Sequence, residues 1–201
     1  MGLMKLQYEE GQTPLDEDEK DGLLLPSVTT RSELDEVEQR NIEEAIRWTT
    51  ERRRRFTVAE ILTEDFVRQL HQKMLGGVWE WAGTFRKSDK NIGVDKYQIP
   101  TELKTLLDDC KFWIGHGTFS ADEIAIRFKH RIVSIHCFAN GNGRHSRLIA
   151  DVIIEKIFWR DVFTWGSADL IQGEEFRSTY LQALREADNG NYGPLLKFAR
   201  S

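Results

Sequence analysis

Residues 136–147, HCFANGNGRHSR, bring together several groups that could do chemistry within twelve positions. His136 supplies an imidazole whose ordinary pKa of about 6.5 suits proton transfer near neutral pH. The Gly141, Asn142 and Gly143 turn can adopt backbone conformations closed to other residues, so several N–H groups can point at one centre. The pattern predicts a general base beside a turn that accepts an anion.

Two arginines complete this motif. Arg144 and Arg147 are three positions apart, so they share one face of the helix expected to start near Arg144. Guanidinium groups bind phosphate oxygens, and the first helical turn adds N–H groups and the positive end of its dipole. A nucleotide or similar ligand fits such a site, with Phe138 pinning the loop in the core and His145 on the surface. A glycine-rich loop can also cap a helix without binding anything, and a lone histidine is more often structural.

The composition is that of a soluble globular protein with one substantial core: 201 residues, 40% hydrophobic and 30% charged. The net charge of −5 makes nucleic acid an unlikely general partner, although Arg52–Arg55 could touch phosphates locally. Cys110 and Cys137 form no recognisable disulfide or metal framework. The N-terminal residues lack the apolar run of a signal peptide, and no segment approaches the roughly 20 apolar residues of a membrane span. We therefore expect a cytoplasmic protein with no membrane partner.

Helical periodicity predicts an all-α fold with one short β-hairpin. Residues 1–26 are expected to form an acidic N-terminal arm, anchored through LLLP at 23–26, before a helical domain at 27–201. Asn91, Ile92 and Gly93 mark a turn, which predicts an irregular hairpin at about 84–98. Three helices are expected with their caps: one from Ser32 to about Arg55, one at 63–74 that Thr63 caps, and one at 120–135 that Ser120 caps. Four more are expected at about 101–115, directly after the motif as a buried helix, at about 168–187, and as a short helix in PLLKFAR.

The motif resembles the signature of the Fic-domain family, HxFx[D/E]GNGRxxR. WEWAGTFR at 79–86, the expected hairpin, and YLQALREADNGNYGPL at 180–195 agree with the family in order. Residues 13–26 and the segment that follows resemble a subgroup called mobile mystery protein B. The likeness covers about residues 12–198 and implies a Fic-type helical bundle. The residues that match the signature are His136, Phe138, Gly141, Asn142, Gly143, Arg144 and Arg147.

The resemblance implies a protein adenylyltransferase, because Fic proteins typically transfer AMP from ATP to a hydroxyl of a target protein. His136 would deprotonate the target Ser, Thr or Tyr, and the Gly–Asn–Gly turn would hold the α-phosphate region. Arg144 would contact the β-phosphate and Arg147 the γ-phosphate. Residues 84–98 would be the flap that pairs with an extended target segment. Cys137 stands where many relatives have Pro and is expected to be a packed loop residue.

Asn140 departs from the family pattern. Members that transfer AMP usually have Asp or Glu there to hold Mg²⁺, which prefers carboxylate oxygens. An amide oxygen in place of the carboxylate should lower the affinity for the metal, although the phosphates of ATP supply most of the negative charge that binds it. Three outcomes stay open: slow AMP transfer from ATP, a different phosphate-containing donor, or a nucleotide-binding regulatory module that works with a small partner protein.

Many Fic proteins inhibit themselves with a helix that carries [S/T]xxxE[G/N] and places its Glu against the second arginine of the motif. Ser32 and Glu36 fit all but the last position of this pattern, where Val37 stands. Thr29 and Glu33 fit no better, because Leu34 follows them. Acidic residues also stabilise the first turn of any helix. The hypothesis is that Glu36 or Glu33 restrains Arg147.

Overall fold

The computed structural model describes residues 14–50, 56–166 and 174–201. These residues form helices joined by turns and isolated β-bridges, without a sheet, which confirms the all-α fold class. The helices are α1 (Glu17–Lys20), α2 (Arg31–Thr50), α3 (Val58–Ile61), α4 (Glu64–Leu75), α5 (Ile99–His116), α6 (Ala121–Ile135), α7 (Asn142–Lys156), α8 (Glu174–Asp188) and α9 (Gly193–Arg200).

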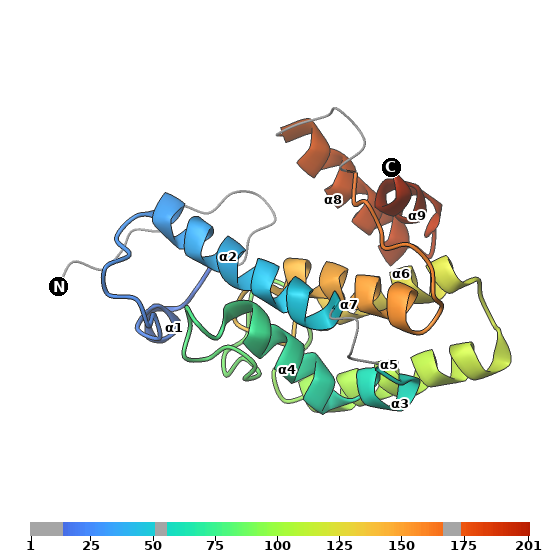
Figure 1. Cartoon of the computed structure of the whole chain (residues 1–201), viewed down its shortest axis with the longest axis horizontal. Helices are drawn as coiled ribbons and strands as arrows, with labels where there is room; N and C mark the ends of the chain where they lie inside the picture. Colours follow the sequence, from blue (N-terminus) through green and yellow to red (C-terminus); the bar gives the residue numbers. More distant parts are fainter. Residues whose placement is uncertain (1–13, 51–55, 167–173) are drawn as a thin grey trace.

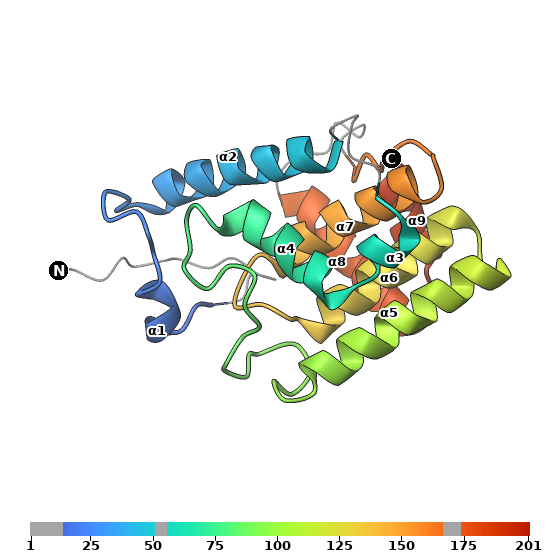
Figure 2. The ribbon, with the colours of Figure 1, turned by 60° about the horizontal axis from the view of Figure 1, so that its bottom comes forward.

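Helices α6 and α7 form the centre of the bundle. They pack on each other, α4 covers α7, and α2 lies on α4. Helix α5 packs along α6 on the side away from α2, while α8 and α9 pair with each other on one side of the bundle, where α9 contacts α6 (Figures 1 and 2). The loop between α6 and α7 therefore starts and ends on the two most enclosed helices.

The sequence explains why α7 is central. Its apolar residues extend round most of the helix, and six of them are buried, namely Leu148, Ile149, Ala150, Val152, Ile153 and Ile154. This confirms the buried helix expected after the motif. The predicted caps of two neighbouring helices are also confirmed, because Thr63 accepts the Phe66 N–H and Ser120 accepts the Glu123 N–H.

Helix α2 begins at Arg31, so Ser32 lies inside it rather than at its cap. The Thr30 hydroxyl accepts the Glu33 N–H at 3.3 Å, and the Glu33 carboxylate accepts the Thr30 N–H at 3.0 Å. This reciprocal pair is a capping box that begins two residues before the expected cap.

The described part of the arm packs on the helical bundle. Leu15 is buried, and the chain at Leu23 forms an antiparallel bridge with Trp79. The Trp81 indole N–H donates to the Glu19 carbonyl at 2.9 Å. The expected anchoring role of residues 23–26 is thus confirmed at Leu23, whereas a domain boundary at residue 26 stays a prediction.

The predicted hairpin at 84–98 is wrong. The Arg86 N–H donates to Cys137 O at 2.9 Å and the Val94 N–H donates to Ile135 O at 3.4 Å, so both limbs bond to the end of α6 and the loop after it. The Arg86 guanidinium fills the space between the limbs by donating to the carbonyls of Ser88 and Val94. Hydrogen bonds from the Arg86 side chain thus stand in place of the backbone bonds between two strands that the turn at residues 91–93 predicts.

None of the helices within residues 14–50, 56–166 and 174–201 has the length and apolarity needed to cross a membrane. The Arg52–Arg55 run lies outside the described residues, as does the first part of the helix expected at 168–187. Of that helix, the structure describes α8 from Glu174 onward.

Candidate active site

The loop between α6 and α7 is framed by two residues with left-handed backbone conformations. His136 ends α6 with φ of 58°, and Gly141 precedes α7 with φ of 76°. A side chain at Gly141 would be strained, and its Cβ would lie 2.6 Å from Leu75 Cδ1. Helix α7 begins at Asn142, so its first N–H groups, which have no carbonyl partner within the helix, face the loop.

The Asn142 side chain closes the loop from inside. Its Oδ1 accepts the Phe138 N–H at 3.0 Å, and its Nδ2 donates to the Phe138 carbonyl at 2.8 Å. Both residues are buried, and Phe138 points into the core as predicted. The Asn142 side chain is therefore committed to the loop, which leaves its backbone N–H as the group able to meet an anion.

His71 of α4 is a positioning residue that the sequence analysis missed. Its Nε2 donates to the Asn140 carbonyl at 3.0 Å, while its Nδ1 accepts the Gly83 N–H at 2.9 Å, which fixes the tautomer. Its ring stacks on Phe138 with centroids 3.7 Å apart. Burial holds the pKa of His71 well below its ordinary value, with further lowering from His145 and Arg144. Nothing in the motif's spacing pointed to a partner that far away in sequence.

The expectation that His145 lies on the surface is wrong. Its side chain is buried, its Nε2 bonds to the Val67 carbonyl at 3.0 Å, and its ring meets Phe138 edge-on. Helix α4 covers this face of α7, which the local sequence could not reveal. Burial lowers the pKa of His145 to about 4.

His136 lies at the start of the loop with 4% of its surface exposed. Its carbonyl accepts the Arg86 Nε–H at 2.7 Å, and Gly93 packs so closely that an added Cβ would lie 2.7 Å from the His136 Cβ. Burial, then the charges of Arg86 and Lys90, lower the pKa of His136 to about 4, although a backbone hydrogen bond at Val133 opposes the shift. The imidazole is therefore neutral at neutral pH and able to accept a proton.

Arg144 and Arg147 lie on α7 one turn apart, with different neighbours. Arg144 Nη1 is 2.7 Å from Glu38 Oε2, and the other oxygen of this buried carboxylate accepts the Trp79 indole N–H. The Arg147 guanidinium carbon lies 5.8 Å from the centre of the Tyr180 ring. Both arginines keep some exposed surface, so an anion at the loop can reach them.

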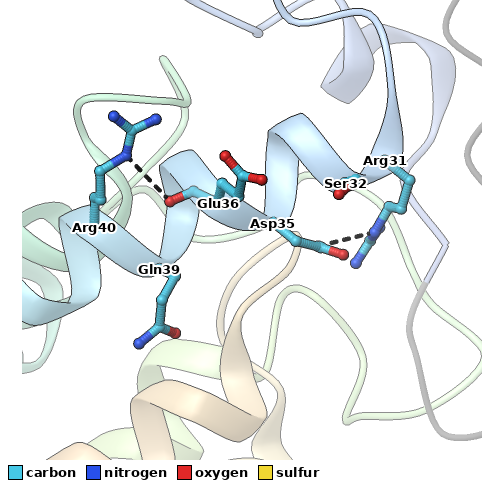
Figure 3. Close-up of a pocket in the computed structure, with 6 residues that line it drawn as sticks. All are labelled: Arg31, Ser32, Asp35, Glu36, Gln39 and Arg40. Atoms are coloured by element: carbon cyan, nitrogen blue, oxygen red, sulfur yellow. Dashed lines mark hydrogen bonds and ion pairs between the residues drawn. The ribbon is translucent and has the colours of Figure 1, made fainter.

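The structure does not bring Glu36 or Glu33 to Arg147. The Glu33 carboxylate accepts N–H groups at the start of its own helix. Glu36 is exposed and lines a shallow pocket on α2 with Arg31, Ser32, Asp35, Gln39 and Arg40 (Figure 3). The carboxylate of α2 that the structure pairs with an arginine of the motif is Glu38, and its partner is Arg144. Glu36 therefore lies on the exposed face of α2, whereas Glu38 lies on its buried face.

The residues of the loop do not fit a magnesium ion. Asn140 Oδ1 accepts the Gly141 N–H at 2.6 Å, so one of the two lone pairs of this neutral amide oxygen already has a donor. Within the described residues there is no cluster of three or more His, Cys, Asp or Glu side chains that could hold a metal. Mg²⁺ prefers carboxylate and phosphate oxygens in octahedral geometry, which a single amide does not provide.

The site thus joins a neutral imidazole, a turn of N–H groups and two guanidinium groups around one short loop. Cys137 is buried beside them with its pKa raised to about 12 by burial, as expected of a packed loop residue rather than a nucleophile. Apart from His71, the sequence analysis missed Arg86 and Glu38. Arg86 bonds to the carbonyl of His136, 50 positions later in the chain, and Glu38 pairs with Arg144, 106 positions later.

The site lies within a match to a known family. Residues 61–154 match the sequence model of the Fic/DOC family. Two curated relatives, both named protein adenylyltransferase Fic, come from Aedes aegypti (25% identical) and Drosophila virilis (27% identical), and each alignment covers 69% of this chain. The alignments cover 27% and 28% of the relatives, so the chain spans about a quarter of their length.

Solved structures share the fold at low sequence identity. BepC from Bartonella tribocorum, solved with bound AMPPNP, is 16% identical with a TM-score of 0.65, and the match covers 92% of this chain and 97% of that one. Fic-1 from C. elegans is 22% identical with a TM-score of 0.61, covering 90% and 50%.

Proposed function

We propose, from the premise that residues 61–154 form a Fic/DOC family domain, that this protein is an adenylyltransferase that moves AMP from ATP to a hydroxyl of a target protein. The curated relatives support this proposal through their name, and the fold is shared with structures that hold AMPPNP or ADP. The observation that carries it is the arrangement of the loop: a neutral His136 at one end and two arginines at the other.

The proposed nucleotide lies with its phosphates against the start of α7. The turn at Gly141, Asn142 and Gly143 holds the α-phosphate region, where the positive end of the helix favours negative charge. The N–H groups of Asn142 and Gly143 face the phosphate, because the Gly141 N–H already donates to Asn140 Oδ1. Arg144 contacts the β-phosphate and Arg147 the γ-phosphate. Because the Asn142 side chain already shapes the loop, its share in binding is through the backbone alone.

His136 is the proposed base. It takes the proton of a target Ser, Thr or Tyr hydroxyl while that oxygen forms a bond to the α-phosphorus of ATP. The bond from that phosphorus to the bridging oxygen breaks, and pyrophosphate leaves. Beside burial, the positive charges of Arg86 and Lys90 weaken His136 as a base. The negative phosphates of ATP would offset them and raise its basicity.

A Mg²⁺ requirement imposed by the chain itself is not part of this mechanism. Asn140 supplies no carboxylate, and its amide oxygen is engaged by Gly141. Any chemistry that depends on a protein-held metal should therefore be weak in the natural protein and should appear in the Asn140→Asp variant.

Residues 84–98 are the proposed docking segment for the target. Ile92 and Tyr97 project there, with 48% and 83% of their surfaces exposed. Large apolar side chains on the surface beside a site commonly contact a partner. Because Gly93 packs on His136, a target held along this segment would lie close to the base.

A second candidate function is a nucleotide-binding module that regulates a small partner protein without turnover. The buried Glu38 favours it, because its pairing with Arg144 occupies one of the two cations that the phosphates need. A transferase that uses another phosphate-containing donor also remains open. Nucleic-acid binding through Arg52–Arg55 is less favoured because of the net charge of −5.

The role of Glu38 is tested by Glu38→Gln, which keeps the shape of the side chain and its acceptor for Trp79 but removes the charge. We expect ATP affinity to rise several-fold, about 1 kcal/mol, because Arg144 no longer has to break an ion pair with residue 38 before it binds a phosphate. Glu36→Gln on the exposed face of the same helix is the matched control. Equal ATP affinity in all three proteins would remove Glu38 as a restraint.

The transfer reaction is tested by incubating the protein with α-³²P-ATP, Mg²⁺ or Mn²⁺ and a cell lysate, beside the His136→Ala and Asn140→Asp variants. Label on protein with the natural chain, lost in His136→Ala while ATP still binds, is the expected result. Label that persists in His136→Ala would remove the proposed base. Label that appears only with Asn140→Asp would favour the binding module or another donor.

A further inference from the structure

A buried lysine lies behind the arginine at the far end of the motif. Lys129 of α6 has 0% of its surface exposed, and its Nζ is 2.6 Å from the hydroxyl of Tyr180 on α8. The same Nζ lies 4.6 Å from the centre of the Tyr180 ring. A buried lysine normally has a carboxylate partner, because a buried unpaired charge is strongly unfavourable.

Among the residues that the structure describes, the charges around Lys129 leave it without such compensation. Arg147 of α7 is the charge that acts on it most strongly and is repulsive, while Asp188 of α8 attracts it less strongly. The Asp188 carboxylate is largely exposed and bonds to His130 Nε2 at 2.8 Å. Burial and Arg147 together hold the pKa of Lys129 well below its ordinary value.

The other helices around α6 do not change this balance. On α7, Asp151 lies one turn beyond Arg147 and is held by Phe163 and Trp165. Helix α5 contributes the buried thiol of Cys110, whose pKa burial raises to about 12. Helix α9 packs Phe198 against Tyr180, while its Lys197 and Arg200 are exposed. Arg147 is thus the one group of these that links Lys129 to the loop.

Tyr180 connects the two cations. Its ring lies beside the Arg147 guanidinium at 5.8 Å, and its hydroxyl bonds to Lys129. When Lys129 is neutral, the Tyr180 O–H donates to the lone pair of Nζ. When Lys129 is protonated, the ammonium donates to the Tyr180 oxygen. The contact therefore survives a change in protonation, while the net charge behind Arg147 changes by one.

We propose that Lys129 is a specificity residue for the terminal phosphate: a nucleotide whose last phosphate pairs with Arg147 binds together with one proton, which Lys129 takes up. The inference rests on the proposed function, because it takes Arg147 as the contact of that phosphate. The phosphate neutralises the charge that opposes protonation, and the proton arrives from solvent at Nζ. Lys129 then adds a positive charge that favours a triphosphate over a monophosphate.

The test is calorimetric titration of the full chain with ATP and with AMP, in two buffers of different ionisation enthalpy, at several pH values between about 7 and 9. The difference in binding enthalpy between the two buffers gives the number of protons taken up on binding. Protons that ATP itself binds or releases at each pH are subtracted. We expect uptake with ATP and none with AMP. Affinity for ATP should fall by up to about tenfold per pH unit where uptake is complete.

Two variants test whether Lys129 is the group that takes up the proton. Lys129→Met, which fills the same space without charge, should abolish the uptake and flatten the pH dependence, with a lower ratio of ATP to AMP affinity. Tyr180→Phe keeps the lysine and the ring but removes the bond between them, and should shift the uptake to a different pH range. Each variant is compared with the natural protein by thermal unfolding.

Uptake that is unchanged in Lys129→Met would overturn the assignment. ATP binding without any uptake in the natural protein would overturn the proposal while leaving the adenylyltransferase function intact. Failure of the natural protein to bind ATP would overturn both. The three failures are therefore distinct.

Discussion

The loop at residues 136–142 and the segment at 84–98 lie against each other but are held in different ways. In the loop, buried side chains bond to the backbone: His71 to Asn140, and Asn142 to Phe138. In the segment, one buried arginine bonds to the backbone, and ion pairs with the arm add further contacts, as at Lys90 with Asp16 and Glu19. The group proposed for catalysis thus lies in the region held by buried side chains, and the target is proposed to dock on the region held in part by ion pairs to the arm.

The largest expected effect comes from replacing Arg86, whose side chain bonds to both the loop and the segment. Arg86 donates to the carbonyls of His136, Ser88 and Val94, and its side chain is fully buried. Arg86→Met leaves these carbonyls without their donor and should lower the free energy of unfolding by about 3 kcal/mol, measured by urea denaturation. Lys87→Met, on the exposed next residue, is the control. A loss below about 1 kcal/mol in Arg86→Met would mean that the loop does not depend on the segment.

A smaller loss is expected when the loop alone is changed. His71→Phe keeps a ring against Phe138 but leaves the Asn140 carbonyl and the Gly83 N–H without their partner. The free energy of unfolding should fall by about 2 kcal/mol. ATP affinity should fall with it, because Asn140 leads directly into the turn. His116→Phe on the exposed end of α5 is the matched control. Unchanged ATP affinity in His71→Phe would show that His71 does not position the turn.

Acid should weaken the loop more than the segment. The pKa values of His136 and His145 are lowered to about 4, below the ordinary value near 6.5. Between these values the unfolded chain binds protons that the folded chain does not, so stability present above about pH 6.5 is lost as the pH falls toward 4. Asp151 acts in the opposite direction, because burial raises its pKa to about 6 and its contribution is lost as the pH rises through that value.

The pH prediction is checked by urea denaturation at about pH 7.5 and pH 5, where the natural protein should lose about 2 kcal/mol. His145→Gln, which keeps a hydrogen-bonding side chain that does not titrate, should reduce that loss. Equal losses in the two proteins would assign the acid sensitivity to groups outside this face of α7.

The smallest expected effect is on the ion pairs of the arm. Lys90 has 3% of its side chain exposed and contacts both Asp16 and Glu19, whose own exposure is larger. Asp16→Asn with Glu19→Gln leaves amide oxygens that can accept from the Lys90 ammonium, so it should cost only about 1 kcal/mol, and the cost should shrink at high salt. The matched control is Glu17→Gln with Asp18→Asn on the outer side of α1. Hydrogen exchange should increase at residues 84–98 but not at 136–142. Increased exchange in both would contradict the comparison.

Features set by neighbouring residues could be predicted from the sequence. Thr63 and Ser120 cap helices because a hydroxyl and an N–H three positions apart need no tertiary contact. The burial of α7 followed from apolar residues on nearly all sides. In the candidate site, neighbouring residues alone were enough to predict the loop at 136–141, the helix N-terminus that follows it and the burial of Phe138.

Features set by distant contacts could not be predicted this way. His145 was expected on the surface because its covering helix, α4, comes 70 residues or more earlier in the chain. The hairpin was expected because its sequence favours extended strands, but the Arg86 side chain bonds to the limbs instead. Glu38 was overlooked for Glu36 because a family pattern does not tell which face of α2 meets α7. Sequence spacing identifies a face of a helix but not the element that covers it.

The central claim is that the loop holds a chain of phosphates against Arg144 and Arg147. The most direct test is calorimetric titration with ATP, ADP and AMP at one pH, using the natural protein and Arg147→Met. Affinity should rise from AMP to ADP to ATP in the natural protein, and Arg147→Met should remove most of the gain from ADP to ATP. Equal affinity for all three nucleotides, unchanged in Arg147→Met, would contradict the claim.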